Sequence, residues 1–153
     1  MQMLKKILLP ILILTLIFFS GCGNSQEVQV EKISEQTINT NIKITVNGKT
    51  FDAELEDNES ARKFLEKLPL EITMTELNGN EKYYRFNENF PSDDESVGTI
   101  HAGDLMLYSS SYVVIFYKDF PTSYSYTRLG KILNVDGLDK MLGSGNVTVK
   151  FER

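Results

Sequence analysis

The chain has 153 residues, 41% of them apolar, and a formal net charge of −5 at pH 7. An acidic chain of this kind repels phosphate groups, so we expect no nucleic-acid partner. Cys22 is the only cysteine and His101 the only histidine. Disulfide cross-links within the chain are therefore excluded, and too few nitrogen and sulfur ligands remain for a zinc site. We expect no metal and no cofactor.

The first 21 residues have the pattern of an export signal. Lys5 and Lys6 give it a positively charged start, and an apolar run interrupted only by Pro10 and Thr15 occupies residues 7–19. This run is too short to span about 30 Å of hydrocarbon as a helix, which needs ~20 residues, but it suits the core of a signal peptide. We therefore expect residues 1–21 to be a signal peptide that is removed on export.

Cys22 follows Ser20 and Gly21 at the end of that run, in a pattern that resembles the lipobox of bacterial lipoproteins. Lipidation needs a thiol nucleophile at this position, and it would consume the only thiol of the chain. This predicts a lipoprotein that is exported and anchored to the bacterial cell membrane through acylated Cys22. The alternative is an ordinary secretory signal followed by a chance cysteine.

A polar stretch separates Cys22 from the first strand pattern. Residues 22–40 are rich in Gln, Glu, Asn, Ser and Thr and contain no aromatic side chain. Such composition cannot bury enough apolar surface to fold by itself. We expect residues 22–40 to form a flexible tether and residues 41–153 to form one folded domain.

Two Asn-Gly pairs mark hairpin turns. Apolar and polar residues alternate on both sides of Asn47-Gly48, and the pair Asn78-Gly79 separates two further runs of strand character. A type I′ turn needs positive φ at both central positions, which asparagine and glycine tolerate. The pattern therefore predicts two β-hairpins.

Two helices are expected. Residues 57–59 open a segment with apolar residues at helical spacing as far as Leu68, and Pro69 stops it. Later in the chain, Asp136 could cap a single helical turn over residues 138–142 that Gly143 would close.

The remaining segments complete a mainly β chain. A long polar loop occupies residues 87–103, residues 105–108 and 112–117 are apolar on both faces, as central strands are, and strands are expected at 129–133 and 147–151. About eight strands with one main and one short helix predict a small closed or partly closed β-barrel, since closure removes exposed sheet edges.

Several segments resemble the bacterial cyclophilin-like domains, which are small β-barrels with the fold of cyclophilin. The resemblance is carried by residues 102–108, 113–117, 126–132 and 142–145, and it extends over about residues 41–152. It implies a cyclophilin-like barrel for the folded domain.

The catalytic residues of cyclophilin do not carry over with the fold. Cyclophilins catalyse rotation about X-Pro bonds with an arginine aimed at the prolyl nitrogen. When Gly103-Asp104 is aligned without gaps on the family's Gly-Asp pair, His101 falls at the family's glutamine and Asp93 at its arginine. The chain also has no tryptophan. We assign no catalytic residue, because the fold alone does not imply isomerase activity.

A ligand pocket has five candidate residues in this sequence: Arg85, His101, Phe116, Tyr126 and Arg128. Tyrosine and arginine combine broad apolar area with polar tips, which suits binding surfaces. His101 lacks the partner residues that nucleophilic or metal catalysis needs. Strand faces need covering in any fold, so only convergence of these side chains around one cavity would favour a binding role over a structural one.

The sequence leaves three functional hypotheses. The first is a lipid-anchored binding module that holds a peptide or small ligand outside the cell membrane without catalysis. The alternative is an extracytoplasmic peptidyl-prolyl cis-trans isomerase or folding helper with a rearranged active site. The third is a purely structural envelope protein.

Overall fold

The computed structural model describes residues 39–153. The signal peptide, Cys22 and nearly all of the tether lie outside the described residues, so these assignments stay predictions. Within residues 39–153, no helix has the length and apolar character needed to cross a membrane.

The described residues form eleven strands and two helices. The long strands are β1 (Asn41–Val46), β2 (Lys49–Leu55), β3 (Leu70–Leu77), β4 (Glu81–Arg85), β7 (Asp104–Tyr108), β8 (Tyr112–Phe116), β10 (Ser125–Ile132) and β11 (Val147–Glu152). Three strands have two residues each: β5 (Glu95–Ser96), β6 (Thr99–Ile100) and β9 (Phe120–Pro121). The helices are α1 (Glu59–Leu65) and α2 (Leu138–Leu142).

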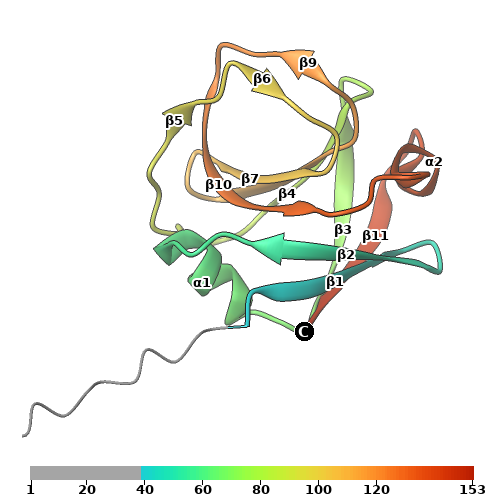
Figure 1. Ribbon diagram of the computed structural model, residues 1–153, viewed down its shortest axis with the longest axis horizontal. Helices are drawn as coiled ribbons and strands as arrows, with labels where there is room; N and C mark the ends of the chain where they lie inside the picture. Colours follow the sequence, from blue (N-terminus) through green and yellow to red (C-terminus); the bar gives the residue numbers. More distant parts are fainter. Residues whose placement is uncertain (1–38) are drawn as a thin grey trace, which may run out of the picture. The chain divides into compact units, whose positions relative to one another are not determined.

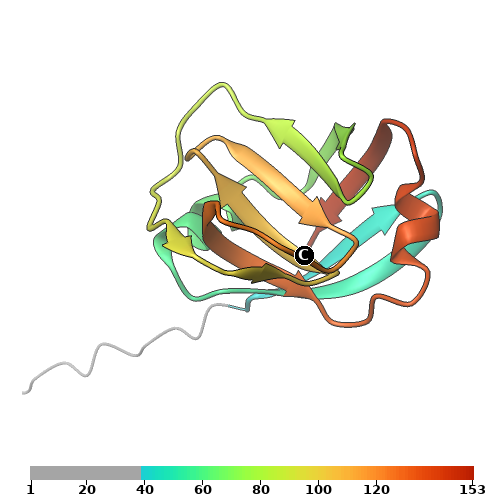
Figure 2. The same ribbon diagram turned by 90° about the horizontal axis from the view of Figure 1, so that it is seen from above.

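The eight long strands close into an antiparallel barrel (Figures 1 and 2). Their order is β2-β1-β11-β3-β4-β8-β7-β10, and β10 pairs back onto β2. A β-bulge between Arg128 and Gly130 bends β10 toward this closing contact. Gly130 is needed there because a Cβ atom would clash with the Glu54 carbonyl oxygen and lie 2.8 Å from the Leu55 Cα. The predicted mainly β barrel of about eight strands is confirmed.

Both Asn-Gly turns form the predicted hairpins. Asn47 and Gly48 have φ values of 48° and 79° between β1 and β2, and Asn78 and Gly79 have φ values of 56° and 68° between β3 and β4. Positive φ at both central residues is the conformation that a type I′ turn requires.

Helix α1 starts where the sequence indicates and ends earlier than predicted. The Asn58 side chain accepts a hydrogen bond from the Ala61 backbone N–H and caps the helix. The helix ends at Leu65 and not at Leu68, because the last turn tightens and the Leu68 N–H bonds to the Leu65 carbonyl three residues back. Inside the barrel, the ring of Phe64 meets that of Phe151 edge to face with 5.3 Å between centroids.

Three expectations for the second half of the chain need correction. Asp136 does not cap α2: the cap position is Gly137, and the Asp136 carbonyl accepts a hydrogen bond from the Lys49 ammonium. The polar loop at residues 87–103 contains β5 and β6, which become strands only by pairing with β10 and β9. The strand expected at residues 129–133 is the second half of β10, whose first half pairs with β7 and β5.

The apolar residues form two layers because β7 and β8 are covered on both faces. Side chains such as Leu107 and Ile115 belong to the main core inside the barrel. Met106, Val114 and Phe116 point the other way and pack in a smaller outer cluster with Ile100 and Phe120 of the β6–β9 ribbon. This ribbon is drawn at the end of the domain farthest from the start of β1 (Figure 1). The candidate site lies beside this outer cluster.

Candidate ligand-binding site

An aromatic pocket of about 530 Å³ opens on the outer side of the barrel. We define it by its principal lining residues, which are Asn80, Glu81, Tyr83, Tyr108, Tyr112, Phe120, Tyr124 and Tyr126. The strands β4, β7 and β8 supply the floor, and the segment joining β9 to β10 supplies one wall. Its volume lies within the range of small-molecule sites.

The five tyrosines that line the pocket, Tyr83, Tyr108, Tyr112, Tyr124 and Tyr126, form what we call the tyrosine wall. Tyr108 lies at its centre. Its ring centroid lies 6.3 Å from that of Tyr112, 5.6 Å from Tyr126 and 6.0 Å from Tyr124. Tyr83 extends the wall, with 6.0 Å between its centroid and that of Tyr112. These rings meet at inclined angles of 49° to 82°, so that they surround a space and do not stack into a closed layer.

The pocket floor is rigid where it meets the outer cluster. Phe116 is fully buried, and its ring lies 5.5 Å from that of Tyr126 and 5.7 Å from that of Phe120. Tyr108 and Tyr124 remain 37% and 61% exposed above this floor. Contiguous exposed aromatic area of this kind is typical of binding surfaces.

Two polar groups stand among the aromatic rings. Burial, together with the negative charge of Glu76, raises the pKa of Glu81 to about 6. Burial and the charge of Glu81 raise the pKa of Tyr126 in turn, so this carboxyl group acts on the tyrosine wall. The side-chain oxygen of Asn80 is buried and has no hydrogen-bond partner within residues 39–153. Within the described part of the chain, Glu81 is the only charged residue that lines the pocket.

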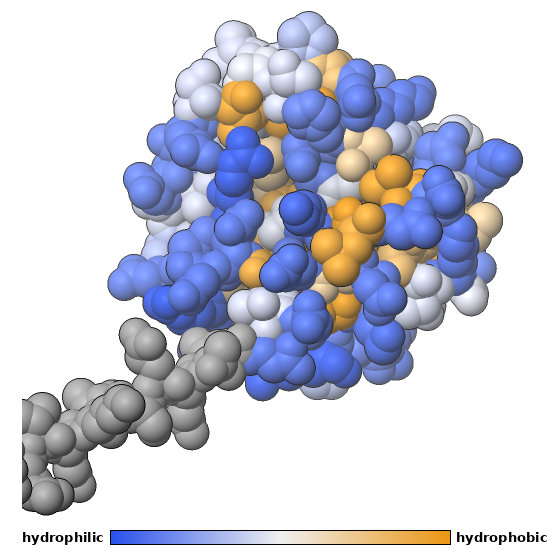
Figure 3. Space-filling model, viewed as in Figure 1, coloured by the Kyte–Doolittle hydropathy of each residue, from blue (hydrophilic) through white to orange (hydrophobic). Residues whose placement is uncertain are grey.

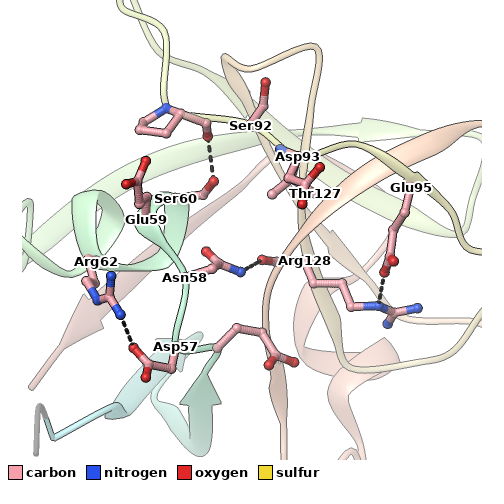
Figure 4. Close-up of a pocket in the computed structure, with 12 residues that line it drawn as sticks. Asp57, Asn58, Glu59, Ser60, Arg62, Ser92, Asp93, Glu95, Thr127 and Arg128 are labelled. Atoms are coloured by element: carbon pink, nitrogen blue, oxygen red, sulfur yellow. Dashed lines mark hydrogen bonds and ion pairs between the residues drawn. The ribbon is translucent and has the colours of Figure 1, made fainter.

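A second pocket, of about 550 Å³, is polar and lies between α1, β5 and β10 (Figure 4). Both of its arginines are already paired with carboxylates: Arg62 with Asp57 at 2.5 Å, and Arg128 with Glu95 at 2.8 Å. The Asn58 side-chain amide donates to the Arg128 carbonyl at 2.8 Å. These bonds hold α1 and the β5 segment to β10, which gives the polar pocket a structural purpose.

Apolar side chains also gather on the face seen in Figure 1, which is otherwise mainly hydrophilic, and one patch lies near the end of β10 (Figure 3). Leu133 and Val135, which follow β10, are 54% and 37% exposed. Neither lines the aromatic or the polar pocket. We therefore place the candidate site in the aromatic pocket.

Of the five predicted site residues, Tyr126 lines the aromatic pocket, and Phe116 packs against its ring from the buried outer cluster without lining the pocket itself. Arg85 adjoins it, since its guanidinium lies 5.7 Å from the ring centroid of Tyr112. Arg128 instead lines the polar pocket. His101 is exposed and lines neither pocket.

The turn at His101 has a structural role. The His101 backbone N–H donates to the Asp104 carboxylate at 2.8 Å, so Asp104 fixes the turn around Gly103. For the described part of the chain, no group of three or more His, Cys, Asp or Glu residues is arranged to hold a metal ion.

Sequence reasoning missed Asn80, Glu81, Tyr108 and Tyr112 as site residues. Side chains alternate between the two faces of a strand, which puts Glu81, Tyr83 and Arg85 on one face of β4. Tyr108 and Tyr112 flank a tight turn and are register partners across β7 and β8. No local signal indicates the burial of Glu81, because it depends on residues far along the chain.

Comparisons with known proteins agree with this architecture. A sequence model described as the cyclophilin-like family matches residues 44–152. A hypothetical protein from Archaeoglobus fulgidus, known from a solution structure, has 19% sequence identity and a TM-score of 0.55 over 79% of this chain and 99% of its own. At that identity the likeness concerns the fold alone. No curated protein matches the chain.

Proposed function

The chain belongs to the cyclophilin-like family, and on this premise we propose that its barrel is a non-enzymatic binding module that holds a peptide or small ligand in the aromatic pocket. The observation that carries the proposal is the convergence of five tyrosines, from four strands and a connecting segment, around one open pocket. A purely structural barrel would not need to leave Tyr124 and Tyr108 exposed there.

The chemistry of the pocket supports binding. Ligand sites are mostly apolar and carry a few polar groups that fix orientation. Tyrosine offers a large contact area with few rotatable bonds, so a ligand orders it at small entropic cost. The aromatic pocket fits this description, whereas the polar pocket has little apolar lining and both of its arginines are paired with its own carboxylates.

One observation favours the alternative function of a prolyl isomerase. Arg85 stands beside Tyr112 at the edge of the aromatic pocket, where a guanidinium could reach a bound peptide. A protease-coupled assay on proline-containing peptides tests it. If the protein accelerates isomerisation, and Arg85→Ala abolishes this activity while Arg153→Ala preserves it, the domain is an isomerase and the binding-module proposal is wrong.

We also propose that the domain is exported and held at the cell membrane by lipid on Cys22. The signal pattern of residues 1–21 supports this, as does the polar stretch before β1. Replacing Cys22 with Ser should release the protein from membranes, and retention of this variant would refute the anchor.

Ligand binding is tested by nuclear magnetic resonance on the full chain in detergent micelles. We would screen short peptides and small organic fragments and follow backbone amide shifts. Binding at the aromatic pocket predicts shifts centred on Tyr108, Tyr112 and Tyr126 that Tyr108→Ala abolishes and Leu133→Ala preserves. Shifts confined to the polar pocket, or none with any probe, would overturn the proposal.

A further inference from the structure

The walls of the aromatic pocket suit a positive charge. The face of an aromatic ring carries negative potential, and a cation within about 6 Å of a ring centroid is attracted to it. Tyr108 and its three neighbouring tyrosine rings meet at different inclinations, so one cation between them can approach more than one ring face. Among residues 39–153, no Lys, Arg or His lines the pocket, although Arg85 adjoins it at the Tyr112 ring.

Glu81 is an anionic group without a partner. No ammonium or guanidinium lies within ion-pair distance of its carboxylate among residues 39–153. The adjacent Lys82 points to the opposite face of β4, where it bonds to Glu76 and two carbonyl groups. A carboxylate taken partly out of water is costly unless a positive charge compensates it.

Asn80 adds a directional requirement. Its buried side-chain oxygen has no donor within the described residues, and buried acceptors are nearly always satisfied. This oxygen is closed to solvent in the structure, so a ligand with an N–H group can donate to it once the Asn80 side chain turns toward the pocket. A quaternary ammonium has no N–H group and cannot, so the residue favours a primary ammonium or a guanidinium.

These three observations point to one class of ligand, and we propose that the aromatic pocket recognises an N–H-bearing organic cation, a primary ammonium or a guanidinium group. The charge would lie between the tyrosine rings and the Glu81 carboxylate, with an N–H directed to Asn80. The same group occurs in free amines and in lysine or arginine side chains of peptides. This inference rests on the proposed binding function and specifies its ligand chemistry.

The test is a calorimetric titration of the full chain in detergent micelles at pH 7.5. The probes share a short alkyl chain and differ in the charge of the group at its end. Butylammonium and butylguanidinium carry the proposed group, butan-1-ol is the neutral isostere, and butyrate is the anion. The methylamides of Nα-acetyl-lysine and Nα-acetyl-arginine carry the same cations on a peptide-like backbone. Comparing them with the free amines shows whether the pocket prefers a peptide side chain or a free amine. We expect the cations to bind at least about tenfold more tightly than the alcohol.

Variants locate the effect. Glu81→Gln should weaken cation binding about tenfold or more, and Asn80→Leu should remove the preference for butylammonium over tetramethylammonium. Glu71→Gln, an exposed glutamate of β3 outside the pocket, serves as the matched control and should bind as the parent does. Amide spectra of each variant verify that it is folded.

The outcomes separate this inference from the proposed function. Equal binding of butan-1-ol and butylammonium, or stronger binding of butyrate, overturns the cation assignment. If neutral probes bind at Tyr108 under those conditions, the binding module stands without it. If no probe of any charge perturbs the pocket, both are overturned.

Discussion

The ammonium of Lys82 is fully buried and forms an ion pair with Glu76 on the neighbouring strand. Its other two N–H groups donate to the carbonyls of Gly143 and Gly145 at 2.8 and 2.7 Å. The Tyr117 hydroxyl donates to the same carboxylate at 2.8 Å. All three donors of the ammonium are therefore satisfied. The network ties β3 and β4 to the segment between α2 and β11.

Replacing Lys82 with Met should destabilise the fold strongly. The substitution leaves the Glu76 carboxylate without its charge partner and two carbonyl groups without donors, and breaking a buried pair on one side costs about 3–5 kcal/mol. Because the Glu76 side chain keeps 20% exposure, we expect about 3 kcal/mol, measured by urea unfolding.

An exposed lysine provides the comparison. Lys150 pairs with Glu152 at the surface, where its side chain is 44% exposed, and Lys150→Met should cost less than about 1 kcal/mol. Equal losses for the two lysine variants would show that burial of the Lys82 pair does not matter.

Glu81 should make the fold less stable as pH rises. Burial and the charge of Glu76 on β3 raise its folded pKa to about 6, above the ordinary value of 4.5. The folded protein therefore binds the proton more tightly than the unfolded chain, and stability is lost between about pH 4.5 and 6. The nearby Tyr126 is neutral throughout this range, which lies far below the ordinary tyrosine pKa of 10, and burial raises the pKa of Tyr126 further.

Glu81→Gln removes that loss. We expect the variant to exceed the parent by about 1 kcal/mol at pH 7.5 after allowance for solvent screening. The two proteins should unfold at the same urea concentration at about pH 4. A variant that is no more stable than the parent at pH 7.5 would contradict the assigned environment of Glu81.

Gly130→Ala should open the barrel at its closing contact. The new Cβ would press against the Glu54 carbonyl and lie 2.8 Å from the Leu55 Cα, and backbone on that side has no flexible end that can move away. We expect a loss of about 3 kcal/mol or failure to fold. Gly145→Ala, with nothing within 4 Å of its Cβ, should change stability by less than about 0.5 kcal/mol. Thermal unfolding of both variants decides the matter.

Asn58 has two separable functions at the start of α1. Its oxygen caps the helix through the Ala61 N–H, and its amide donates to the Arg128 carbonyl, each at 2.8 Å. Asn58→Ala removes both bonds and should cost about 2 kcal/mol, whereas Asn58→Asp keeps the cap and should cost about 1 kcal/mol. Denaturant unfolding that gives the same loss for both variants would mean that the cap contributes nothing.

The local elements and the fold class could be predicted from the amino-acid sequence. The turns at Asn47-Gly48 and Asn78-Gly79 follow from the backbone conformations that these residues tolerate, and strand alternation follows from the pleat. These signals act over a few residues and need no tertiary contact. That is why the hairpins and the mainly β barrel could be predicted.

Segments whose conformation depends on a distant partner could not be predicted. Residues 95–96 and 99–100 read as loop because two-residue strands exist only through pairing with β10 and β9. Asp136 has the side chain of a helix cap, yet Gly137 occupies the cap position of α2. The Asp136 carbonyl accepts a hydrogen bond from the ammonium of Lys49, which is distant in sequence.

The position of the candidate site depends on tertiary contacts and could not be predicted from the sequence. Tyr126 and Arg128 lie two residues apart on one strand, but Tyr126 pairs with β5 and lines the aromatic pocket, whereas Arg128 pairs with β7 and lines the polar pocket. Glu81 and Lys82 are adjacent in sequence, yet one faces a tyrosine wall unpaired and the other is buried in an ion pair. Burial and charge pairing are set by side chains that barrel closure brings together from distant positions, and no pattern along the chain contains that information.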